Sequence, residues 1–152
     1  MAKHNPEDTI LMNMCVLRDE NNNVLALDKV TGRYRGTTFP GGHVEKGEVF
    51  RDAIIREFQE ETGLIIDNPV LCGLYHWYRE DIHNILIVYS ANSYKGEINS
   101  SREGEVYWIP LEELKKKDLA TGTEHVIKLT ESNEIFETVM RPDGDTYSGT
   151  LY

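Results

Sequence analysis

The sequence lacks the features that would place the protein in a membrane, outside the cell or on a nucleic acid. No apolar run in its 152 residues approaches the roughly 20 residues needed to cross a bilayer. The first ten residues, MAKHNPEDTI, are polar and do not contain the apolar core of an export signal, so we expect a cytoplasmic protein. Only 16 Lys and Arg stand against 26 Asp and Glu, and the formal net charge of -10 argues against stable nucleic-acid binding through a broad basic surface.

Cysteine is also scarce, and this absence excludes a disulfide framework or a cysteine-rich zinc site. Cys15 and Cys72 lie far apart in apolar segments, with no CxxC pattern or Cys/His cluster, so we interpret them as buried, reduced thiols. There is also no repeat, low-complexity tract or linker. The composition, 39% apolar and 28% charged, is typical of a globular protein, and the length predicts one domain over residues 1–152.

The apolar and turn residues predict an α+β fold with many strands and one strong helix. Strands are expected at 9–17, 24–30, 69–78, 84–93, 105–109, 135–140 and 146–152, where β-branched and aromatic residues are concentrated. The first two should form a hairpin, and so should the last two, through the turn PDGD. Helices are expected at 48–62, ended by Gly63, just after Pro110, and at 123–130.

The helix at 48–62 carries acidic side chains where apolar ones are expected. At about 100° per residue, three glutamates fall on the same stripe as three apolar residues: Glu57, Glu60 and Glu61 with Phe50, Ala53 and Ile54. Carboxylates facing a core are destabilising unless they are neutralised, and the single neighbouring Arg56 cannot neutralise three of them. We therefore infer that a divalent cation binds here.

Residues 42–64, GHVEKGEVFRDAIIREFQEETGL, place their Gly, Glu, Arg-Glu, Glu-Glu and Gly at the spacing of a Nudix box. The FPGG segment before the box and EGEVYWIP at 103–110 also resemble the Nudix hydrolase family. The resemblance implies the Nudix fold, a mixed β-sheet sandwiched between α-helices, here with a C-terminal β-hairpin. It also implies Mg²⁺- or Mn²⁺-assisted hydrolysis of a nucleoside diphosphate linked to another group.

The box glutamates are suited to binding a hard cation. Glu57, Glu60 and Glu61 stand at i, i+3 and i+4, so their carboxylates should converge within one helical turn. By resemblance, the backbone carbonyl of Gly41 is a further ligand. This role fits a Gly-Gly turn, where the main chain can approach a metal closely.

The catalytic roles follow from the resemblance and from charge. Arg56 should orient Glu57 by a charge-assisted hydrogen bond, and Glu48 should steady the loop or hold a metal-bound water. Glu57 is the candidate general base under the family's commonest scheme. Some members use a glutamate from a later loop instead, and Glu103 and Glu105 lie in the region where such a residue occurs.

The substrate residues are expected among the aromatic side chains. Tyr34, Phe39, Trp77 and Trp108 are candidates for stacking on a base, and Asn84 beside either tryptophan is a candidate for reading a purine edge. The layout, including Trp108 shortly after the acidic loop, resembles MutT-type 8-oxo-dGTP diphosphatases. These enzymes cleave a nucleoside triphosphate to a monophosphate and pyrophosphate.

Other readings of the box remain open. Diadenosine polyphosphates, RNA 5′-triphosphates and nucleotide sugars are alternative substrates. ADP-ribose is disfavoured because its hydrolases carry a marker proline beyond the box, and this chain has none between Pro69 and Pro110. A nucleotide-sensing domain without catalysis is disfavoured because such domains usually lose box glutamates, and here they are intact. The sequence predicts a monomer or a homodimer equally well.

Overall fold

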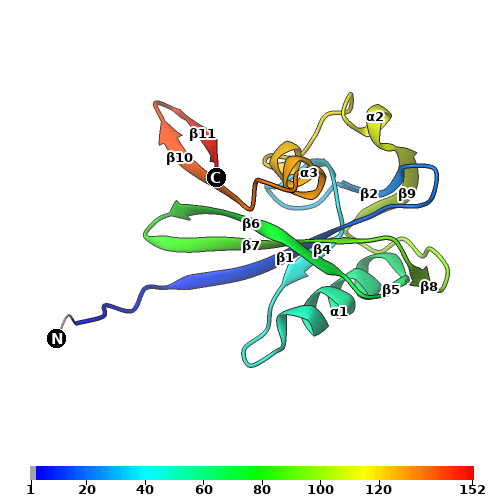
Figure 1. Cartoon of the computed structure of the whole chain (residues 1–152), viewed down its shortest axis with the longest axis horizontal. Coiled ribbons are helices and arrows are strands. Elements are labelled where there is room, and N and C mark those ends of the chain that lie inside the picture. The colour runs from blue at the N-terminus through cyan, green and yellow to red at the C-terminus, as the bar shows by residue number, and fades with distance from the viewer. Residues whose placement is uncertain (1–2) are drawn as a thin grey trace.

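The computed structural model describes residues 3–152, and its main element is a six-stranded mixed sheet (Figure 1). The strand order is β11-β10-β6-β7-β1-β4. β1 runs parallel to β7 and β10 runs parallel to β6, whereas the other neighbours are antiparallel. The bounds are β1 (Thr9–Leu17), β4 (Gly41–His43), β6 (Val70–Arg79), β7 (Ile82–Ala91), β10 (Glu137–Asp143) and β11 (Thr146–Leu151).

Two smaller sheets and three helices complete the described chain. One sheet has the order β3-β2-β9, and the other pairs β5 with β8. The strands are β2 (Asn23–Lys29), β3 (Gly36–Thr38), β5 (Ile65–Ile66), β8 (Tyr94–Lys95) and β9 (Gly104–Pro110), and the helices are α1 (Phe50–Thr62), α2 (Leu111–Leu114) and α3 (Thr123–Glu131). Among the residues described, no helix is long and apolar enough to cross a membrane.

The large sheet separates two apolar cores, one under each long helix. On one face, Ile54 and Phe58 of α1 pack in a buried cluster with Cys15 and Leu17 of β1. On the other face lies a second cluster, to which α3 contributes Val126 and Leu129 and the sheet contributes Met14, Tyr75 and Leu86. Figure 1 shows α1 and α3 on opposite sides of the sheet. The alternation of β1 residues between the clusters follows from the two-residue period of a strand.

The predicted hairpin between the first two strands is wrong. β1 lies in the large sheet and β2 in the three-stranded sheet, and only the single bridge between Arg18 and Val24 joins them. Because β1 is buried on both faces, it takes a central place beside β7 rather than an outer place in a hairpin. The Asp19 carboxylate accepts the backbone N–H groups of Asn21 and Asn23, and this turn redirects the chain to the second sheet.

The other elements fall close to the predicted positions. The C-terminal hairpin is confirmed: β10 pairs antiparallel with β11, and Gly144 in the turn has a φ of 61°. The helix of the box is confirmed as α1, and Gly63 ends it in the left-handed conformation, with a φ of 81°. α1 begins at Phe50 rather than near Glu48, and the Phe50 side chain is 45% exposed instead of buried. The angular position of Phe50 around the helix axis fixes the direction of its side chain, but it does not determine whether neighbouring elements cover the first turn.

Candidate active site

The Gly41-Gly42 strand lies directly against α1, and a side chain at either position would collide with a neighbouring group. A Cβ on Gly42 would lie 2.2 Å from Oε2 of Glu57, and one on Gly41 would lie 2.0 Å from the carbonyl oxygen of Asn13. The Gly41 N–H donates a 3.0 Å hydrogen bond to Oε2 of Glu61, and the Gly42 N–H donates to Oδ1 of Asn13 at 2.9 Å. The absence of side chains therefore brings main chain and carboxylates together.

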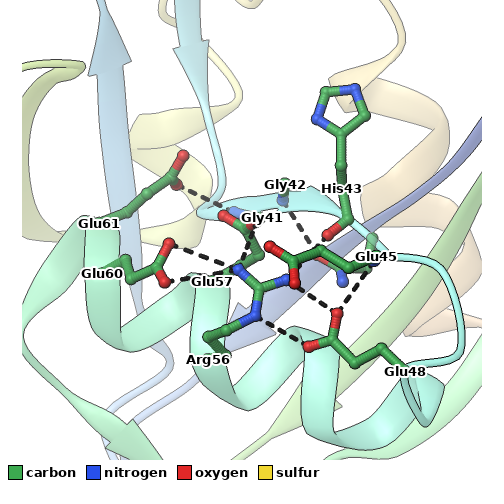
Figure 2. Close-up of polar contacts among 10 residues, drawn as sticks. Gly41, Gly42, His43, Glu45, Glu48, Arg56, Glu57, Glu60 and Glu61 are labelled. Carbon is green, nitrogen blue, oxygen red and sulfur yellow. Dashed lines mark hydrogen bonds and ion pairs between the residues drawn. The ribbon is translucent and has the colours of Figure 1, made fainter.

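Arg56 is the centre of the polar contacts around the box (Figure 2). Its guanidinium donates to both carboxylate oxygens of Glu48, with Nε–Oε1 at 2.8 Å and Nη2–Oε2 at 3.0 Å. It also donates to Oε1 of Glu57 at 2.8 Å, to Glu60 at 3.4 Å and to the carbonyl of His43 at 3.1 Å. These contacts have the geometry required by the predicted roles of Arg56 in orienting Glu57 and of Glu48 in steadying the loop.

Glu48 connects the loop before α1 to the helix by hydrogen bonds. Its Oε2 accepts the backbone N–H of Glu45 at 3.0 Å while the same carboxylate binds Arg56. The hydrogen bonds from Arg56, together with that from Glu45, hold the pKa of Glu48 below its ordinary value. Glu48 is therefore ionised near neutral pH and acts as a fixed acceptor between loop and helix.

The three box glutamates differ in their surroundings, which corrects the prediction that all of them face the core. Glu61 is buried, with 6% of its surface exposed, whereas the side chains of Glu57 and Glu60 are 17% and 59% exposed. Arg56 holds Glu57 and Glu60, and Gly41 holds Glu61. In this arrangement no three His, Cys, Asp or Glu side chains within residues 3–152 lie close enough together to hold one metal ion.

Glu103 adds a fourth carboxyl group beside Glu61. Burial, and then a hydrogen bond shared with Glu103, raise the pKa of Glu61 to about 8. The same hydrogen bond lowers the pKa of Glu103, and Lys29 Nζ lies 3.3 Å from its Oε2. Glu61 is buried, and its partners are the Gly41 N–H and Glu103, whereas the Glu103 side chain is 46% exposed and pairs with Lys29. A divalent cation beside Glu61 fits this donor set. Glu105 is exposed on β9 and has no such contact, so only Glu103 is brought to the box.

A cavity of about 670 Å³ opens beside Glu61 and Gly41, on the face of the sheet that α3 covers. Tyr34, Phe39 and Trp77 line it, as predicted. The wall also includes residues that the sequence did not single out, namely Met12, Asn13, Met14, Lys29, Arg33, Tyr75, Arg79, Met140 and Tyr147. The two-residue alternation of β6 was the signal for Tyr75 and Arg79, because they share a face with Trp77. The loop residue Arg33 carried no local signal.

Two predicted substrate residues do not line this cavity. Trp108 lies on the α1 side, partly buried against Leu25 and its neighbours, with its ring centroid 5.5 Å from that of Tyr94. Asn84 shares a strand pair with Trp77, but its amide donates to the carbonyl of Ile82 at 3.1 Å. The prediction that Trp108 or Asn84 contacts a base is therefore not supported, because strand direction and a local hydrogen bond turn them elsewhere.

The sequence profile of the NUDIX domain matches residues 12–130, which include the box, most of the cavity wall and most of α3. The chain belongs to the Nudix family. Nudix hydrolases act on pyrophosphate bonds in nucleotide substrates and generally use a divalent metal.

Individual relatives differ in what their names say they hydrolyse. An uncharacterised Nudix hydrolase of Bacillus subtilis is 34% identical over 119 residues, which cover 74% of this chain and 73% of the relative. An ADP-ribose pyrophosphatase of Methanocaldococcus jannaschii is 33% identical over 114 residues, covering 72% and 66%. An 8-oxo-dGTP diphosphatase of Escherichia coli is 27% identical over 114 residues, covering 74% and 88%.

Solved structures confirm the predicted fold. The crystal structure of a mutator MutT protein from Bacillus halodurans superimposes with a TM-score of 0.79, at 26% identity, over 93% of this chain and 97% of that one. A MutT Nudix hydrolase from Burkholderia pseudomallei gives a TM-score of 0.71 at 19% identity, over 81% of this chain and 98% of the other, and it supports the fold alone.

Proposed function

We propose that the protein is a Mg²⁺- or Mn²⁺-dependent Nudix enzyme that cleaves a nucleoside triphosphate to a monophosphate and pyrophosphate, with 8-oxo-dGTP as its favoured substrate. The observation that carries the proposal is the position of the buried Glu61, with Glu103 beside it, at the wall of an aromatic cavity. Such a site places a binding position for a cation and phosphates next to a binding position for a nucleobase.

The metal ligands in this proposal are the carboxylates of Glu57, Glu60 and Glu61 and the carbonyl of Gly41. The bound ion would neutralise charge on the phosphate oxygens during hydrolysis. Glu57 accepts a proton from the attacking water in the scheme we favour, and its contact with Arg56 holds it in the required orientation. Glu103 is the alternative base because it lies beside Glu61, and its lowered pKa keeps it ionised.

The cavity supports the choice of a nucleotide over a smaller diphosphate. Phe39, Tyr75 and Trp77 offer apolar and aromatic surface for a base. Lys29, Arg33 and Arg79 line the same cavity with Glu61 as the only acidic side chain, although the whole chain carries a net charge of -10. This local excess of positive charge favours a polyanionic ligand. The 8-oxo-dGTP diphosphatase relative from E. coli supports the preferred substrate.

ADP-ribose is the second candidate, because a relative named as an ADP-ribose pyrophosphatase is 33% identical. That similarity argues against setting the class aside on a missing proline alone. Diadenosine polyphosphates, RNA 5′-triphosphates and nucleotide sugars are further candidates, and a binding module without catalysis is the alternative of another kind. The complete set of box glutamates argues for catalysis.

The test is a comparison of kcat/KM with Mg²⁺ for 8-oxo-dGTP, dGTP, ADP-ribose, a diadenosine polyphosphate and 5′-triphosphorylated RNA. We expect 8-oxo-dGTP to lead dGTP by more than about tenfold, which corresponds to about 1.4 kcal/mol of transition-state binding. A smaller ratio removes the role in clearing oxidised nucleotides. A lead by ADP-ribose selects the second candidate, and binding without turnover on every compound selects the binding module.

A further inference from the structure

A cluster of histidine and glutamate side chains lies on the face of the large sheet that does not carry the cavity. Tyr75, Trp77 and Arg79 of β6 line the cavity, so the intervening His76 projects to the opposite face. His83 on β7 lies diagonally across from it, because β7 pairs His83 with Tyr78 and Ile85 with His76. Neither histidine belongs to the proposed hydrolase site.

Four side chains from four segments form a continuous chain of contacts here. Nδ1 of His76 lies 2.9 Å from Nε2 of His83. The other nitrogen of each ring meets a carboxylate: Nε2 of His76 lies 2.8 Å from Oε1 of Glu137 on β10, and Nδ1 of His83 lies 2.8 Å from Oε1 of Glu7 before β1. The Tyr78 hydroxyl donates to the second oxygen of Glu7 at 2.6 Å.

The two histidines have too few N–H groups to donate along the whole chain of contacts while both rings are neutral. Ionised carboxylates only accept hydrogen bonds, so the nitrogens facing Glu7 and Glu137 must both carry a hydrogen. Each neutral imidazole has one N–H, which these contacts use. The two inner nitrogens then point lone pair at lone pair across 2.9 Å, an arrangement that is repulsive unless a cation lies between them. That cation is either one shared proton or a metal ion.

We propose that His76 and His83 bind a transition-metal ion of the zinc type through their inner nitrogens. A tetrahedral zinc site with Zn–N bonds of about 2.0–2.1 Å places two ligating nitrogens roughly 3.3 Å apart. The two nitrogens must separate by about 0.4 Å to reach that spacing, and the rings must tilt so that both lone pairs point at the ion. Glu7 and Glu137 already occupy the outer positions that carboxylates take in carboxylate–histidine–zinc groups, where they fix the tautomer and increase ligand basicity.

The exposure and chemistry of the pair define which ions it accepts. The side chains of His76 and His83 are 17% and 15% exposed, so water can fill the remaining coordination positions. Imidazole nitrogen suits Zn²⁺, Cu²⁺ and Ni²⁺, whereas carboxylate and carbonyl oxygens suit Mg²⁺. The pair should therefore bind zinc-type ions while the box holds Mg²⁺, and this inference does not depend on the hydrolase activity.

The test is a zinc titration of the tag-free protein, against a chromophoric chelator, with excess Mg²⁺ present to fill the oxygen site. We expect one equivalent of zinc to bind in the wild type and in His43→Gln, a control histidine beside the cavity. The same equivalent should be lost in His76→Gln and His83→Gln. Magnesium-dependent turnover by His83→Gln should match that of the wild type, which also checks that the variant is folded.

A milder variant keeps the proposal testable if the histidine variants do not fold. Glu7→Gln retains both ligating nitrogens and removes only the outer carboxylate, so zinc affinity should fall by about 10–100-fold without being lost. Imidazole resonances of His76 and His83 should shift with zinc in NMR spectra of the wild type. Equal zinc binding in His83→Gln and the wild type, or no binding in the wild type up to millimolar zinc, would overturn the proposal and leave a pair that shares a proton.

Discussion

The box and the cavity are neighbours, but they are built in different ways. Most polar contacts of the box come from one helix, the strand before it and the loop between them, within residues 41–61, and Asn13 and Glu103 add contacts from outside that range. The cavity is assembled from segments between Met12 and Tyr147, including all six strands of the large sheet and the start of α3. A sequence pattern can predict catalytic residues that lie mainly within 21 consecutive positions (residues 41–61). It cannot predict substrate-binding residues that are spread over most of the chain.

The first way to test this contrast is to disturb the box without touching the cavity's aromatic wall. Gly42→Ala places a Cβ 2.2 Å from Glu57 Oε2, so the carboxylate must move. We expect kcat to fall by about 100-fold, the effect of a misplacement of roughly 1 Å, with KM little changed. Gly144→Ala in the distant β10–β11 turn is the control, because a Cβ there meets nothing within 4 Å and its positive φ affects stability alone. Unchanged kcat in Gly42→Ala would show that the placement of Glu57 does not matter.

The second prediction separates the two loop glutamates. Glu103→Gln removes the carboxylate beside Glu61, and we expect kcat/KM to fall by about 10–100-fold, the usual range for groups that support metal ligands. Glu105→Gln changes an exposed side chain on β9 and should leave kcat/KM as it is. Steady-state kinetics with Mg²⁺ checks both. A larger loss of kcat/KM in Glu105→Gln than in Glu103→Gln would assign the supporting role to Glu105 instead.

The third prediction addresses the cavity alone. Trp77→Ala removes an aromatic wall, so KM should rise about tenfold with kcat nearly constant, since stacking on a base contributes about 1–3 kcal/mol. Trp108→Phe, on the α1 side beside Tyr94, should leave KM unchanged. A larger increase in KM from the Trp108 substitution than from the Trp77 substitution would support the sequence-based prediction that Trp108 stacks on the nucleobase.

The smallest expected effect concerns the pH dependence of stability near the cavity. His125 on α3 is buried and stacks on Tyr75 with ring centroids 5.9 Å apart, and burial lowers its pKa. The unfolded chain then binds a proton more readily than the folded protein does. This contribution to stability is complete above the ordinary histidine pKa of about 6.5 and is lost as the pH falls towards the folded pKa. Urea unfolding between pH 5 and pH 8 should give a smaller dependence for His125→Gln, and an identical dependence would contradict this assignment.

The sequence predicted the local parts of the molecule well. The position of α1, its end at Gly63, the C-terminal hairpin and the resemblance to the family all follow from short-range patterns. The pairing of β1 with β7 did not, because partners 74 residues apart in sequence, such as Leu17 and Ala91, leave no local signal of their pairing. Periodicity also placed Glu60 on the core-facing stripe, yet its carboxylate turns back to Arg56. A helical angle fixes the direction of a Cβ and not the path of a long, flexible side chain.

The central claim is that the box performs metal-dependent hydrolysis with Glu57 as an essential group. Its most direct test is pyrophosphate release from 8-oxo-dGTP by the wild type, Glu57→Gln and the control Glu113→Gln, whose glutamate lies exposed on α2. We predict Mg²⁺-dependent release by the wild type and the control, and a loss of about 100-fold or more in kcat for Glu57→Gln with nucleotide binding retained. Turnover by Glu57→Gln equal to that of the wild type would contradict the claim.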